Sequence, residues 1–239
     1  MNYMRLYVLM LVVILCGCST STHIAPVTEL KWHSHLSNQR IHIVTRGETL
    51  YSIAFRYDKD YRQLARYNQV MSPYLLHVGQ IIRLDNSQLG FKHAYVAHYT
   101  KKVAHAIQPR IRPLVTKNNN SSWRWPAKGV VKVNFQPQNG KKGIDIAGKR
   151  GQGVYASQEG IVAYAGNGIA GYGNLIIIQH KGQFLTAYAH NERNIVHEGQ
   201  HVKALQRIAD MGKVNGRYWG VHFEIRRAGQ PINPLNYLK

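Results

Sequence analysis

Residues 219–226 read Trp-Gly-Val-His-Phe-Glu-Ile-Arg, and this stretch decides the fold of the second half of the chain. Apolar residues alternate with Gly220, His222, Glu224 and Arg226, the pattern of a β-strand with one face in a core. Two more pieces, Gly143-Ile144-Asp145-Ile146-Ala147 and Tyr188-Ala189-His190, also alternate. The pattern predicts that Asp145, His190 and His222 share one groove. An Asp with two His is a plausible zinc constellation, but the spacing equally allows three unrelated polar side chains.

The rest of residues 123–239 is predicted to be mainly antiparallel β-structure. Glycines separate short β-branched or aromatic runs, which is typical of strands joined by hairpins. The continuous apolar run in Asn174-Leu175-Ile176-Ile177-Ile178-Gln179 predicts a central strand that is buried on both faces.

Residues 123–239 resemble the M23 (LytM-type) zinc endopeptidases, which cut the peptide bridges of bacterial cell wall. The resemblance rests on the pieces quoted above, with Trp125-Pro126, Tyr172-Gly173-Asn174 and the order His222-Phe223-Glu224. It implies that Asp145 and His222 match metal ligands and that His190 matches a catalytic histidine.

Two positions depart from the pattern of the active enzymes. Lys141 stands where those enzymes carry a third metal ligand, and Gly220 stands where they carry a second catalytic histidine. A catalytic zinc site needs three protein ligands and an open position, and a lysine ammonium only donates hydrogen bonds and repels a cation. We therefore expect no metal, no cofactor and no enzymatic activity, with Asp145, His190 and His222 as remnants of a degenerate site.

Degenerate M23 domains of this kind occur in the NlpD/EnvC-like activators of cell-wall amidases. The resemblance implies a periplasmic murein amidase as partner, docked in a groove at Lys141, Tyr172, His190 and Gly220. One alternative is a zinc-dependent M23 peptidoglycan endopeptidase whose metal site is rebuilt with His180, His197 or His201. A weaker alternative is a purely structural wall anchor.

The N-terminus predicts export. Arg5 precedes an apolar run from Leu6 to Leu15, which is too short to span a bilayer comfortably and is typical of a signal peptide. Leu15-Cys16-Gly17-Cys18 resembles a bacterial lipoprotein cleavage box, which implies a signal peptide over residues 1–17 and lipidation of Cys18. Ser19 favours the outer membrane, with the protein facing the periplasm, and the activator family implies enrichment at the division septum. Residues 18–40 are predicted to be a tether.

Residues 41–84 predict a β-α-α-β unit, and they resemble a LysM domain. Thr49 can cap a helix whose apolar residues follow at i, i+3 and i+4. The family implies peptidoglycan glycan binding in a shallow groove. Its matching positions are Gly47, Glu48, Thr49, Leu50, Met71, Ser72, Pro73 and Tyr74. A bland alternative is that Gly47 only shapes a turn and Leu50 is core.

Charge gives the last constraint. The chain carries 31 Lys and Arg against 11 Asp and Glu, a formal net charge of +20, which favours a polyanionic partner. Because the chain is predicted to be exported, nucleic acid is disfavoured as this polyanionic partner. Residues 85–122 are predicted to be a flexible basic linker. The predicted class is α+β: a LysM domain, a basic linker and an antiparallel β-domain.

Overall fold

The computed structural model describes residues 39–86 and 123–239. The predicted signal peptide, Cys18, nearly all of the tether and most of the linker therefore lie outside the described residues. Within the described ranges, no helix has the length and apolar character needed to cross a bilayer.

The first domain has the predicted β-α-α-β order, which confirms that part of the fold class. Strand β1 (Ile41–Ile43) pairs antiparallel with β2 (Ile81–Arg83), and α2 (Leu50–Arg56) and α3 (Tyr61–Asn68) lie between them in sequence. The Thr49 hydroxyl accepts a hydrogen bond from the Ser52 backbone N–H, as the sequence predicted, and Asp60 caps α3 in the same way. These caps satisfy backbone donors that a helix start leaves unpaired.

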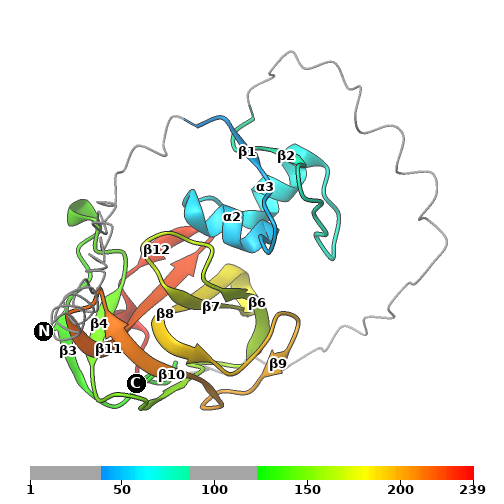
Figure 1. Cartoon of the computed structure of the whole chain (residues 1–239). Coiled ribbons are helices and arrows are strands. Elements are labelled where there is room, and N and C mark those ends of the chain that lie inside the picture. The colour runs from blue at the N-terminus through cyan, green and yellow to red at the C-terminus, as the bar shows by residue number, and fades with distance from the viewer. Residues whose placement is uncertain (1–38, 87–122) are drawn as a thin grey trace, which may run out of the picture. The chain divides into compact units, whose positions relative to one another are not determined.

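The second domain is one sheet that the described residues form from ten strands (Figure 1). Its strands are β3 (Val130–Val133), β4 (Ile144–Ala147), β5 (Gly153–Tyr155), β6 (Gly160–Gly166), β7 (Asn174–Gln179), β8 (Phe184–Asn194), β9 (His201–Val202), β10 (Arg207–Val214), β11 (Tyr218–Arg227) and β12 (Gln230–Ile232). Two short 3-10 helices, Pro137–Asn139 and Lys181–Gln183, lie between strands, and a third, Pro234–Asn236, follows β12. The main order is β3-β4-β11-β10-β8-β7-β6-β9, with β12 on β11 and β5 on β10. All pairings are antiparallel, as predicted.

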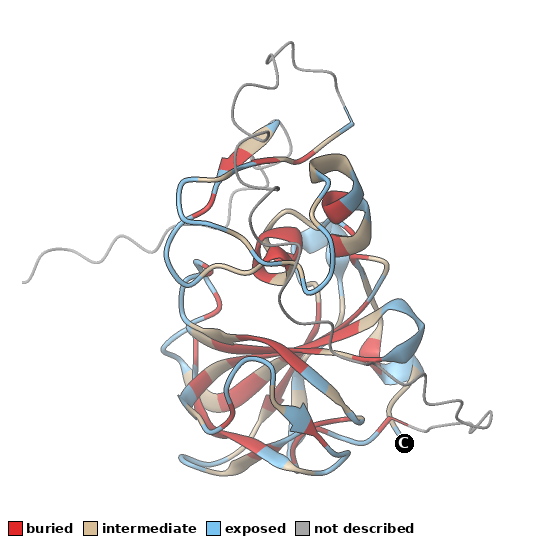
Figure 2. Ribbon diagram, turned by 90° about the vertical axis from the view of Figure 1, so that its right-hand side faces the viewer, coloured by how far each residue is buried: buried red, intermediate tan, exposed pale blue. Residues whose placement is uncertain are grey.

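The core of this domain comes from the alternating and continuous apolar runs. Ile144, Ile146, Val221, Phe223 and Ile225 are fully buried in one cluster, which confirms the predicted inward faces of β4 and β11. Figure 2 shows buried residues running along the strands of the sheet. The prediction for β7 is also confirmed, because its residues 175–178 are fully buried and it lies between β6 and β8.

The second face of β11 differs from the simple alternating pattern. Glu224 and Arg226 are buried as completely as the apolar residues beside them. The two charges tolerate burial because the Arg226 Nε donates to a Glu224 carboxylate oxygen at 2.7 Å. A buried charge is stable only when it is paired and hydrogen-bonded.

Candidate functional site

The sheet register brings two of the predicted site residues together. Asp145 in β4 and His222 in β11 are direct cross-strand partners, so their side chains leave the sheet on the same face. The His222 Nδ1 lies 2.6 Å from Asp145 Oδ1, and the Tyr218 hydroxyl donates to Asp145 Oδ2 at 2.7 Å.

The other side of the His222 ring is held by a second carboxylate. Its Nε2 lies 3.1 Å from Glu224 Oε1, and the hydroxyl of Tyr172 donates to the same oxygen at 2.8 Å. A carboxylate on the second ring nitrogen has the form of the outer contact that supports a metal-binding histidine. The contact between Glu224 and His222 therefore has the form of such a support.

This arrangement sets the charges of the network. Burial alone would lower the pKa of the His222 imidazole, but the carboxylates of Asp145 and Glu224 outweigh burial and raise it to about 9. Burial alone would raise the pKa of the Glu224 carboxyl, and Arg226 and His222 instead hold it well below its ordinary value. His222 is therefore an imidazolium at neutral pH, with both nitrogens donating to carboxylate oxygens.

His190 completes the predicted trio. It lies in β8, and its ring centroid is 6.4 Å from that of His222. Its backbone has φ of 60°, the left-handed region that non-glycine residues rarely adopt, and its N–H donates to the Tyr172 carbonyl at 2.8 Å. Burial and the neighbouring His222 lower the pKa of His190 to about 4. Backbone strain of this kind concentrates at functional sites.

The side chains present do not fit the catalytic zinc ion that M23 enzymes hold. The resemblance assigns only Asp145 and His222 as ligands, and Lys141, which it puts at the position of the third, is exposed. At Gly220 a Cβ would lie 2.8 Å from the carbonyl oxygen of Ile146, so the strands close over the position of the missing histidine. Among the described residues, no three His, Cys, Asp or Glu side chains are grouped to hold a metal ion.

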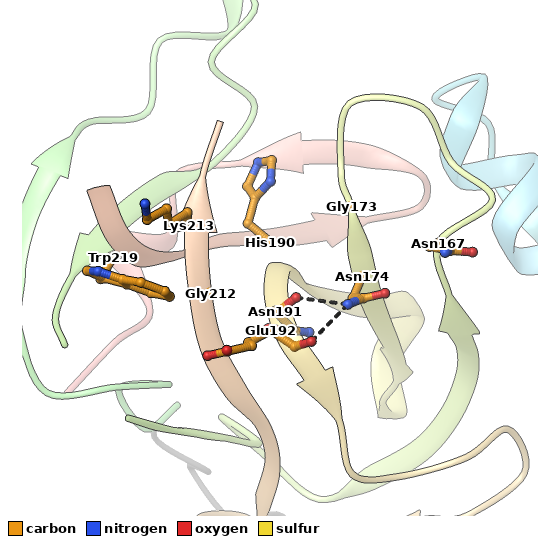
Figure 3. Close-up of a pocket in the computed structure, with 9 residues that line it drawn as sticks. All are labelled: Asn167, Gly173, Asn174, His190, Asn191, Glu192, Gly212, Lys213 and Trp219. Atoms are coloured by element: carbon orange, nitrogen blue, oxygen red, sulfur yellow. Dashed lines mark hydrogen bonds between the residues drawn. The ribbon is translucent and has the colours of Figure 1, made fainter. Parts of the chain in front are cut away.

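A cavity of about 420 Å³ opens beside His190 (Figure 3). Its lining is formed by Asn167, Gly173, Asn174, His190, Asn191, Glu192, Gly212, Lys213 and Trp219. The Asn174 side-chain amide donates to the backbone carbonyls of Asn191 and Glu192, which fixes one wall. Of the residues predicted for the partner groove, only His190 lines this cavity. Tyr172 and Gly220 are buried, and Lys141 is exposed outside the lining.

Of the lining residues, only His190 was predicted for the groove, and Trp219 is the large aromatic residue among those not predicted. Its place in the alternation of residues 219–226 assigned it to the core, yet it is partly exposed at the start of β11. Two cations flank its ring: the Arg150 guanidinium carbon lies 5.5 Å and the Lys213 Nζ 5.3 Å from the ring centroid. The signal that could have found it is its position at the strand end, where alternation no longer ensures burial.

The LysM positions divide into structural and accessible residues. Leu50 is fully buried, so its side chain cannot reach a glycan. The hydroxyl of Thr49 caps α2, and the Glu48 carboxylate pairs with Arg56 at 2.6 Å and with His42 at 2.7 Å. Met71, Ser72 and Pro73 are exposed, Gly47 is an exposed turn residue with φ of 80°, and Tyr74 packs against the small core.

The three histidines considered for a rebuilt metal site lie elsewhere. His197 and His201 are exposed, at a turn and at the start of β9. His180 is buried, with Nδ1 2.7 Å from the Glu159 carbonyl and Nε2 2.7 Å from the Thr186 hydroxyl. These contacts give His180 a structural role in the core.

His180 also makes the stability of the β-domain depend on pH. Burial lowers its pKa to about 4 from the usual value of about 6.5. The unfolded chain takes up the proton first, so the contribution is complete above about pH 6.5 and falls by about 3 kcal/mol as pH approaches 4. In urea titrations followed by tryptophan fluorescence, His180→Asn should flatten this decline, whereas His197→Asn should keep it. An unchanged slope in His180→Asn would contradict the assignment.

Two family models match the chain: LysM domain over residues 42–85 and Peptidase family M23 over residues 139–234. The protein is therefore a LysM protein with an M23 domain. A Pseudomonas aeruginosa protein named lipoprotein NlpD/LppB homolog is 40% identical over 229 residues, covering 82% of this chain and 76% of that protein. The chain belongs to the NlpD/LppB lipoprotein family.

A second relative carries a functional name. The murein hydrolase activator NlpD of Escherichia coli K12 is 34% identical over 252 residues, covering 82% of this chain and 66% of that protein. Among solved structures, Csd3 of Helicobacter pylori aligns with a TM-score of 0.45 and 28% identity, covering 49% of this chain and 33% of that chain.

Proposed function

We propose that this protein binds peptidoglycan and activates a cell-wall N-acetylmuramoyl-L-alanine amidase during septal splitting, without hydrolase activity of its own. The observation that carries the proposal is the incomplete ligand set: Asp145 and His222 are paired with each other, while Lys141 and Gly220 replace the remaining functional groups. The name of the Escherichia coli relative, a murein hydrolase activator, supports the same role.

The two domains divide the work in this proposal. The LysM domain holds the glycan through its accessible loop residues, among them Met71, Ser72 and Pro73. The β-domain docks the amidase at the cavity beside His190. A peptide or helix recognised in a groove needs shape and hydrogen-bonding groups, and it needs no metal.

We also propose that the chain is anchored in the outer membrane through lipidated Cys18, faces the periplasm and gathers at the septum. The cleavage-box sequence and the lipoprotein name of the Pseudomonas relative support the anchor.

One experiment separates the activator from the alternative endopeptidase. Protein from residue 19 onward is purified for metal analysis, and dye-labelled peptidoglycan is used to measure hydrolysis with and without chelator. We expect no stoichiometric zinc and no dye release by the protein alone. Each periplasmic amidase of the same organism is then purified and added singly. We expect the protein to switch on dye release by one of them.

The outcomes are exclusive. Chelator-sensitive release by the protein alone would overturn the proposal and favour a rebuilt zinc site. Peptidoglycan binding without hydrolysis and without activation of any amidase would instead favour the structural anchor.

A further inference from the structure

One aromatic ring of the cavity beside His190, that of Trp219, is flanked by cations. Tyr218 and Trp219 begin β11, and because successive side chains of a strand point to opposite faces, Tyr218 and the nearby Lys132 lie outside the cavity lining. Arg150 and Lys213 flank Trp219 at the distances given above. The turn after β4 and strand β10, far apart in sequence, thus deliver a pair of cations to the Trp219 ring.

These cations are available to a ligand. Arg150 and Lys213 are both exposed. Arg150 pairs with Glu192 at 3.1 Å, but that contact is a surface pair, and such pairs contribute little. The whole domain carries sixteen Lys and Arg against six Asp and Glu, so the surrounding field adds to the local positive charge.

The cavity beside the pair offers a different chemistry. Three asparagines, Asn167, Asn174 and Asn191, line it together with backbone at Gly173 and Gly212. Amide groups both donate and accept hydrogen bonds, as a peptide backbone requires of its binding site. Lys213 and Trp219 belong to this lining as well, so the charged rim and the amide-lined cavity are one continuous surface.

We propose that this surface binds an acidic peptide segment of the amidase, with carboxylates facing Lys213 and Arg150 and an apolar side chain on Trp219. This inference rests on the proposed function and specifies the chemistry of its partner. Charge complementarity selects a carboxylate-bearing segment, because opposite charges across an interface speed association and reject like-charged partners. The amide-lined cavity favours a peptide over a uniform anionic wall polymer, for which cations alone suffice.

The test uses the protein from residue 19 onward, the amidase that it activates and dye-labelled peptidoglycan. In Arg150→Glu/Lys213→Glu we expect the half-maximal activating concentration to rise more than about tenfold. The wild-type value should rise with ionic strength, since screening weakens exposed charges. Lys203→Glu is the matched control: Lys203 is exposed, does not line the cavity and should leave the value within about twofold.

Each result has one meaning. Failure of the wild-type protein to activate any amidase would overturn the proposed function itself. Activation by the wild type and equal activation by Arg150→Glu/Lys213→Glu would overturn only this inference. The inference would also be overturned if the variant no longer pelleted with peptidoglycan but still activated the amidase normally. The cations would then bind peptidoglycan and not the amidase. Circular dichroism of the variant confirms its fold, and Arg150→Gln/Lys213→Gln repeats the test without new negative charge.

Discussion

Replacing Trp219 with Ala should reduce amidase activation by about 30-fold or more at a fixed, sub-saturating concentration of activator. Trp219 lines the cavity beside His190 and is partly exposed between two cations. An aromatic side chain that anchors an interface typically contributes 2 kcal/mol or more on truncation, which corresponds to about 30-fold in affinity. The measurement is the rate of dye release from labelled peptidoglycan against activator concentration.

Trp125→Ala provides the matched control. Trp125 is 38% exposed and does not line the cavity, so its loss should leave activation near the wild-type level. Binding of the chain to peptidoglycan should be unchanged in both variants, because the proposal assigns that task to the LysM domain. Equal loss of activation in both variants would show that the effect is not specific to the cavity.

Gly212→Ala should destabilise the β-domain by about 3 kcal/mol or more. A Cβ at this position would lie 2.3 Å from the carbonyl oxygen of His190 and 2.7 Å from the backbone nitrogen of Glu192. Both are main-chain atoms of β8, so relief requires the strands to move apart. Urea unfolding measures the loss, and fluorescence is suitable because Trp123, Trp125 and Trp219 all lie in this domain.

Gly168→Ala is the comparison for that variant. Among the described residues other than its chain neighbours, its Cβ would approach only the Tyr164 hydroxyl oxygen within 4 Å, at 3.3 Å, and this atom is at the end of a side chain. We expect a loss of less than about 1 kcal/mol. Similar losses in both variants would contradict the close packing of β10 on β8 at His190. The same packing holds His190 at the edge of the cavity, so Gly212→Ala should also reduce activation.

The local pattern of the chain was sufficient for the elements of the first domain, for several strands of the second and for part of the core. Alternation identified the buried face of β11, and the continuous run 174–179 identified a strand buried on both faces. The helix cap at Thr49 could also be predicted from the sequence, because a cap depends on residues within one turn. Local signals of this kind depend on neighbours in sequence and little else.

The groove itself depended on neighbours that are distant in sequence. The resemblance named Tyr172 and Gly220 as groove positions, and the structure buries both. The alternation assigned Trp219 to the core, and the structure places it in the cavity wall. The register of β4, β8, β10 and β11 decides which side chains surround such residues. The periodicity of a single strand carries no information about that register.

The sequence by itself indicated the two domain types, the β-α-α-β order of the first domain and several strands of the second, because each is written in residue identity and short-range spacing. It also showed Lys141 and Gly220 where the resemblance expects a metal ligand and a catalytic histidine. The tertiary structure decided how the remnants are used. The pairing of β4 with β11 sets Asp145 against His222, and Glu224 holds the other ring nitrogen. The convergence of Arg150 and Lys213 on Trp219 likewise exists only after folding, because contacts between distant segments are fixed by strand register and packing.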